Sequence, residues 1–160
     1  MDIPLPSQDV KDYFVTVAKR FGVEYLESVS EATMKKFSDQ QAQGAIWDHM
    51  QRFVIPLPVT VTDSQKSIMM IFIVDIGSPS TILSEEAAFV CEATEKSVAE
   101  LVIMGEKILV RHSVEDEKFK NVNILGTDFL EQIKAEMFIS FPDKRFTLTK
   151  MTEMETKEIS

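Results

Sequence analysis

From residue 53 onward, the chain is a series of short apolar runs rich in β-branched residues, separated by polar turns. Runs of this length and composition predict strands, and the short connections between them predict hairpins. The expected hairpins pair residues 59–62 with 67–74, 100–104 with 107–110, and 138–141 with 145–149. One helix is expected to interrupt the strands, at residues 128–135. This half of the chain is therefore predicted to be mainly β.

The first part of the chain, residues 1–53, is predicted to be a helical region. Apolar residues recur at spacings of three and four between Val10 and Phe21, and Gly22 is expected to end that helix. A second helix is expected at residues 30–37. A third is expected to start at Ser38, with Ala42, Ile46, Trp47 and Met50 on one side. The apolar face of this region must pack either on the downstream strands or on a partner.

Composition limits the classes of function. The formal net charge is −9, and Lys and Arg cluster only in pairs, so nucleic-acid binding is not expected. The longest apolar run, 68–74, is too short to cross a membrane, and the N-terminus does not resemble a signal peptide. Cys91 is the single cysteine, which favours an intracellular location, cytoplasmic or nuclear. No cofactor or metal site is expected, because neither His49 nor His112 has a motif partner.

Two separated motifs lie within the predicted β region. Asp75-Ile76-Gly77-Ser78 follows an apolar strand, and Ile124-Leu125-Gly126 leads directly into the expected helix. In this order, over residues 59–150, they resemble the retropepsin-like aspartic proteases. The resemblance implies an α+β chain with the following parts: a helical region at 1–53, a retropepsin-like domain at 54–150 formed by half of an acid-protease β-barrel with one short C-terminal helix, and a tail or interface strand at 151–160.

The resemblance also implies a homodimer with one Asp75 from each subunit, because the chemistry requires two carboxylates that share a proton. Two features depart from the family. The first is Ile76, which stands where the family has a hydroxyl side chain that forms a hydrogen-bond network across the dimer axis. The second is the flap: no glycine-rich flap hairpin is expected between Ser84 and Glu100, because Glu85 to Val90 suit a helix. Ser78 fits the family pattern, because a serine hydroxyl at this position can hold the carboxylate of the aspartate.

These features predict a pseudoprotease: a non-catalytic retropepsin-like domain that acts as a protein-protein interaction and homodimerisation module. The alternative is an active homodimeric aspartic endopeptidase in which Asp75 is catalytic. A third reading is a domain that binds an extended peptide at a sheet edge. Asp128 is expected to cap the helix that follows Gly126 rather than to act in catalysis.

Overall fold

The computed structural model of the chain describes residues 10–48, 50–92, 98–112 and 121–151. Its helices are α1 (Val10–Arg20), α2 (Glu31–Met34), α3 (Glu85–Val90) and α4 (Thr127–Gln132). Its strands are β1 (Gln41–Trp47), β2 (Arg52–Val61), β3 (Ser67–Val74), β4 (Ile82–Leu83), β5 (Val98–Ile103), β6 (Glu106–His112), β7 (Ile124–Leu125), β8 (Glu136–Ser140) and β9 (Arg145–Thr149). The predicted fold class, mainly β and α+β overall, is confirmed.

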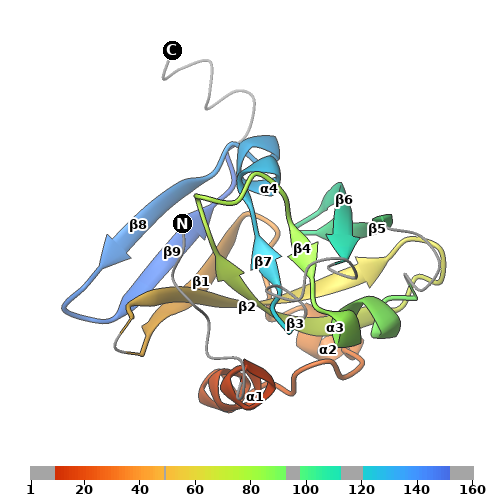
Figure 1. The fold of residues 1–160 in the computed structure, drawn as a ribbon, viewed down its shortest axis with the longest axis horizontal. Coiled ribbons are helices and arrows are strands. Elements are labelled where there is room, and N and C mark those ends of the chain that lie inside the picture. The colour runs from red at the N-terminus through yellow and green to blue at the C-terminus, as the bar shows by residue number, and fades with distance from the viewer. Residues whose placement is uncertain (1–9, 49, 93–97, 113–120, 152–160) are drawn as a thin grey trace.

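The strands form one mixed sheet, most of which curls into a barrel (Figure 1). Antiparallel pairs join β2 to β3, β7 to β4, β6 to β5 and β5 to β2, while β3 with β7 and β4 with β6 are parallel. These pairings return to their starting strand and so close a ring. Strands β1, β9 and β8 extend from β2 as an arm, on the side opposite β5 and β6 in Figure 1.

Strand β2 belongs to both the barrel and the arm. One edge pairs with β3 along most of its length, and the other edge pairs with β1 at residues 52–54 and with β5 at residues 59–61. Pro58 lies opposite Met69, whose backbone bonds to Leu26 and Glu27 instead of β2. The proline nitrogen therefore faces the gap between β1 and β5, where no ladder partner is available for an N–H.

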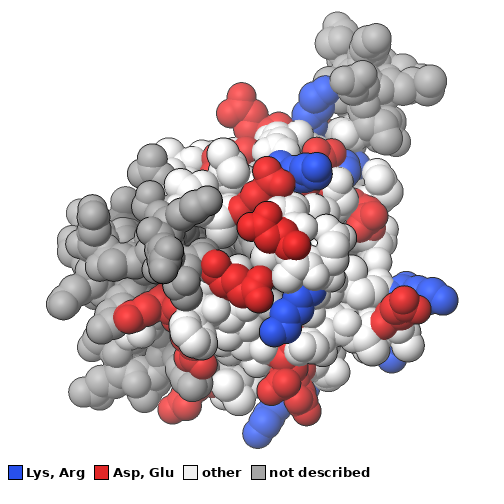
Figure 2. All heavy atoms as spheres, turned by 90° about the vertical axis from the view of Figure 1, so that its right-hand side faces the viewer, with Lys and Arg blue, Asp and Glu red and all other residues white. Residues whose placement is uncertain are grey.

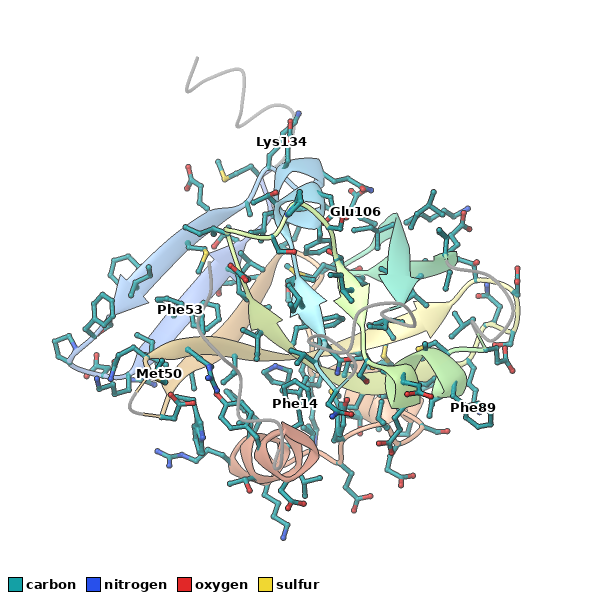
Figure 3. All side chains as sticks on the ribbon, in the orientation of Figure 1. Phe14, Met50, Phe53, Phe89, Glu106 and Lys134 are labelled. Atoms are coloured by element: carbon teal, nitrogen blue, oxygen red, sulfur yellow. The ribbon has the colours of Figure 1, made fainter. Side chains whose placement is uncertain are left out.

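Strand β3 is buried on both faces, which explains its uninterrupted apolar sequence. Met70 and Phe72 pack inside the barrel, whereas Ile71 and Ile73 pack on the outside beneath α1. Phe14 points from α1 toward the strands (Figure 3), and Val17 and Ala18 are buried beside it. The apolar face of this helix thus covers the downstream strands of its own chain.

The predicted first and second helices are present, and Gly22 follows the first with a positive φ of 70°. The third predicted helix is wrong, because Gln41–Trp47 is strand β1. Ala42, Gly44 and Ile46 alternate with more exposed residues, so the period is two. Gly44 permits this pairing, since a Cβ there would overlap the ring of Phe146 on β9. The region 1–53 is therefore helical only in part.

The predicted hairpins and helix of the β region are present, whereas the short strands β4 and β7 were not predicted. The three hairpins correspond to β2–β3, β5–β6 and β8–β9, and the expected C-terminal helix corresponds to α4. The division into segments 1–53, 54–150 and 151–160 remains a prediction, and residues 152–160 lie outside the described part of the chain. None of the described helices is long and apolar enough to cross a membrane.

Candidate functional site

The loop that carries Asp75 begins where β3 ends. The backbone N–H of Asp75 donates to the Leu125 carbonyl at 3.1 Å, which fixes the start of the loop against β7. The half-buried carboxylate of Asp75 accepts the N–H of Gly77 at 2.8 Å. The backbone carbonyl of Asp75 accepts the N–H of Ser78 at 3.1 Å. The loop is therefore a compact turn held by its own aspartate.

The two sequence motifs lie side by side in the structure. Ile73 pairs with Ile124 and Val74 with Leu125 in the parallel β3–β7 ladder. At Gly126, a Cβ would lie 2.5 Å from the Ser80 carbonyl oxygen and 2.8 Å from that of Ser78. Glycine is required here because backbone atoms cannot give way to a side chain.

Asp128 joins helix α4 to the loop that follows the aspartate. Its carboxylate accepts the Thr81 hydroxyl at 2.7 Å, the Thr81 N–H at 3.1 Å and the Phe129 N–H at 2.7 Å. The Thr81 hydroxyl in turn accepts the Gly126 N–H at 3.1 Å. The expected capping role needs correction: Gly126 occupies the N-cap without a side-chain bond, and Asp128 lies in the first turn as a cross-link to Thr81.

A second buried polar cluster, centred on Asn123, also holds the segments that follow β3 and precede β7. The amide of Asn123 accepts the Ser84 N–H at 2.8 Å and donates to the Ile71 carbonyl at 3.0 Å and to the Tyr25 hydroxyl at 2.6 Å. Burial raises the pKa of Tyr25 to about 12, so the hydroxyl stays protonated. Through Asn123, this cluster ties three segments to the residue that precedes β7. They are the segment after α1, which carries Tyr25, strand β3, which carries Ile71, and the start of α3 at Ser84.

The described core contains few buried polar residues, and all of them belong to these two clusters: Thr81, Ser84 and Asn123. Sequence reasoning missed their roles. The available signal was a polar residue placed inside a short apolar run, as in Ser80-Thr81-Ile82-Leu83 and Val122-Asn123-Ile124. Polar groups that are fully buried need hydrogen-bond partners, and here those partners position the loop.

The side chain beside the aspartate is exposed. Ile76 is 76% exposed, and it offers no donor or acceptor to a facing group. The Ser78 hydroxyl was expected to hold the Asp75 carboxylate, but it donates to the Ser80 carbonyl at 2.8 Å. The loop therefore presents one carboxylate and one apolar side chain, and a second carboxylate must come from another chain for dyad chemistry.

Helix α3 occupies the segment between Ser84 and Glu100 in which no flap hairpin was expected. Ser84 caps it by accepting the Ala87 N–H at 3.1 Å, and the expected helical turn at 85–90 is confirmed. Residues 93–97, which complete the connection to β5, lie outside the described residues, as does His49. Among the described residues, no group of three His, Cys, Asp or Glu side chains could hold a metal ion.

No protein-family model matches the chain, and no curated protein matches it. The solved structures that match include the crystal structure of a retropepsin-like aspartic protease from Rickettsia conorii. That protein is 19% identical in sequence, with a TM-score of 0.44, and the match covers 68% of this chain and 89% of that chain.

Proposed function

We propose that the chain is a non-catalytic retropepsin-like domain that acts as a protein-protein interaction and homodimerisation module. The observation that carries the proposal is Ile76, an exposed apolar side chain directly after Asp75. The motif resemblance on the sequence and the barrel that holds Asp75 beside Gly126 support a fold of this class. The side chain needed to hold two such loops in register is absent.

The chemical argument concerns the geometry of a carboxylate pair. Two aspartates that share a proton must be held within about half an ångström of their working positions. A hydroxyl at position 76 would supply a donor and an acceptor to the facing chain, whereas isoleucine supplies neither. Two Ile76 side chains brought together would bury apolar surface, which favours association without orienting the carboxylates.

Strand β8 supplies a surface for a second copy. It is the last strand in the sheet order, so its outer edge has no partner among the described residues. Phe138 on this strand is 74% exposed and the neighbouring Phe141 is 52% exposed. Antiparallel pairing of two β8 strands about Phe138 would place Glu136 opposite Ser140, so no like charges would face each other. Edge strands without a central charge or proline are prone to such pairing.

Activity and assembly test separate parts of the proposal. The purified chain and Asp75→Asn should be equally inactive on a peptide library at acidic and neutral pH, with or without a statine-type inhibitor. Cleavage by the wild-type chain that is abolished by Asp75→Asn would contradict the non-catalytic role. The Asn variant retains an acceptor for the Gly77 N–H, so it should leave the loop folded.

Light scattering after size exclusion should give a dimer. Phe138→Lys should shift it toward the monomer, because it places a charge at the centre of the proposed strand pair. Phe89→Lys is the matched control: Phe89 is 71% exposed on α3, away from β8 (Figure 3), and its replacement should leave the dimer intact. A monomer at all concentrations would contradict homodimerisation.

The second candidate is an active homodimeric aspartic endopeptidase. The observation in its favour is that one Asp75 oxygen accepts the Gly77 N–H while the two motifs remain interlocked. This reading expects activity that depends on protein concentration, has an acidic pH optimum and increases in Ile76→Thr. No activity in Ile76→Thr at concentrations that give the dimer would count against it.

A further inference from the structure

A groove runs along the outer face of strand β1, on the arm rather than at the loop of Asp75. Its floor is formed by β1 residues between Gln43 and Trp47, and its volume is about 640 Å³. Arg20, the last residue of α1, and Phe21, which follows the helix, form one wall. Asp143 and Lys144 in the turn between β8 and β9, together with Arg145 at the start of β9, form the other wall. Grooves of this size accommodate a ligand of several residues.

Three cations line this groove without a charged partner among the described residues. The Arg20 guanidinium lies 5.4 Å from the centroid of the Trp47 ring, and the Lys144 amine donates to the neutral Gln51 amide oxygen at 2.7 Å. Arg20, Lys144 and Arg145 form no ion pair with any other residue that the structure describes. Their charges are therefore available to a bound anion.

The carboxylates in the groove are already engaged. Asp48 forms an ion pair with Arg52 at 3.3 Å and accepts the Met50 N–H. Asp143 accepts the hydroxyl of Ser140 at 3.1 Å. The ion pair offsets the charge of Asp48, whereas the neutral Ser140 hydroxyl leaves Asp143 charged. Three cations therefore face one uncompensated carboxylate, and the groove as a whole favours negative charge.

This local excess of cations is unusual for the molecule. The whole chain carries a formal net charge of −9, and acidic side chains are prominent on the face shown in Figure 2. A basic groove on an acidic protein attracts an acidic segment to one place and repels it elsewhere.

We infer that this groove binds an extended acidic segment of a partner polypeptide, in which acidic residues alternate with apolar ones. The two arginines can each hold a carboxylate through paired N–H donors, and the half-buried Phe21, Ala45 and Trp47 supply apolar contacts between them. A strand-forming segment has the matching period of two. Nucleic acid fits poorly, because three cations cannot offset the charge of the remaining surface.

The inference rests on the proposed role as an interaction module, but the groove and the edge of β8 are different surfaces. A chain that binds an acidic peptide as a monomer would contradict homodimerisation alone. A dimer that does not bind the peptide would contradict the groove alone.

Trp47 makes the groove directly observable, since it is the only tryptophan in the chain. The probe is a short capped peptide in which Glu alternates with Leu and Phe, without Trp or Tyr. Titration should change the Trp47 emission in a saturable way, and added salt should weaken binding. The same peptide with Gln in place of each Glu should bind at least tenfold more weakly.

Variants locate the binding. Arg20→Gln and Arg145→Gln should each weaken binding about fivefold to tenfold, because each removes a charged hydrogen-bond donor. The matched control is Lys134→Gln, an exposed cation next to α4 and away from the groove (Figure 3). It should bind as the wild type does. Far-UV circular dichroism of each variant establishes that the fold is retained.

Three outcomes would overturn the inference. These are equal binding of the Gln peptide, equal weakening by Lys134→Gln, and no binding at about 1 mM peptide by either fluorescence or amide chemical shifts of β1. Tighter binding of a single-stranded oligonucleotide than of the acidic peptide would likewise overturn the choice of partner.

Discussion

Replacing Thr81 with valine removes one hydroxyl from the network that joins the Asp75 loop to α4. That hydroxyl donates to the Asp128 carboxylate at 2.7 Å and accepts the Gly126 N–H at 3.1 Å. A hydrogen bond to a charged group contributes about 1.5 to 3 kcal/mol, and an unpaired buried N–H costs about 1 to 3 kcal/mol. Because both bonds share one atom, we expect a combined loss of roughly 3 kcal/mol.

Urea unfolding followed by Trp47 fluorescence measures this loss. With a slope of about 2 kcal/mol per molar urea, the midpoint should fall by roughly 1.5 M. Thr81→Ser is the control, since it keeps the hydroxyl and removes only a methyl group. Its expected cost is about 1 kcal/mol.

A double-mutant cycle with Asp128→Ala, which removes the acceptor oxygens, tests whether the effect passes through the carboxylate. The two substitutions should be less than additive, because each breaks the same bond. The reasoning fails if Thr81→Val is within about 0.5 kcal/mol of the wild type, or if Thr81→Ser is destabilised as strongly.

Three further predictions address the rest of the molecule. Gly44→Ala should lower the melting temperature by several degrees, because the new Cβ overlaps the Phe146 ring, and differential scanning calorimetry should detect the shift. Burial raises the pKa of the Cys91 thiol from 9.0 to about 12, so Ellman's reagent at pH 8 should react with it only after denaturation. Because the unfolded thiol loses its proton first, the free energy of unfolding should fall as the pH rises from about 9 toward 12. Lys150 lowers the pKa of Glu106 through a 2.9 Å ion pair, so Lys150→Met should remove a small stabilisation that is present at neutral pH and lost in acid; the chemical shift of the Glu106 carboxyl reports the change.

Local patterns predicted the strands because their signals lie within a few residues. The three hairpins combine apolar alternation with polar turns, and both signals can be read without knowledge of distant partners. The third helix failed for a specific reason. Ala42 and Ile46 are four residues apart. This spacing fits about one turn of a helix, and it also fits two repeats of the two-residue period on one face of a strand. Pairing with β9, about a hundred residues later, decides between them.

In the candidate site, too, the local motifs were predicted and the long-range hydrogen bonds were not. The segments around Asp75 and Gly126 were predicted together because the order of the motifs matches a known pattern. The bonds between Thr81 and Asp128 join residues 47 positions apart, and nothing in either local sequence specifies the partner. The Ser78 hydroxyl was assigned to the wrong acceptor because its rotation depends on the carbonyl of Ser80, which only the folded loop brings near.

The sharing of β2 between barrel and arm has a consequence for cooperativity. β2 pairs with β1, β3 and β5, and the arm residues Ala42, Phe146 and Leu148 are buried in one cluster with residues of the barrel, so loss of either part would expose the core of the other. The arm should therefore exchange its amide protons with the global unfolding free energy, as a single folding unit with the barrel. Any partner that stabilises the arm would stabilise the loop of Asp75 by the same linkage.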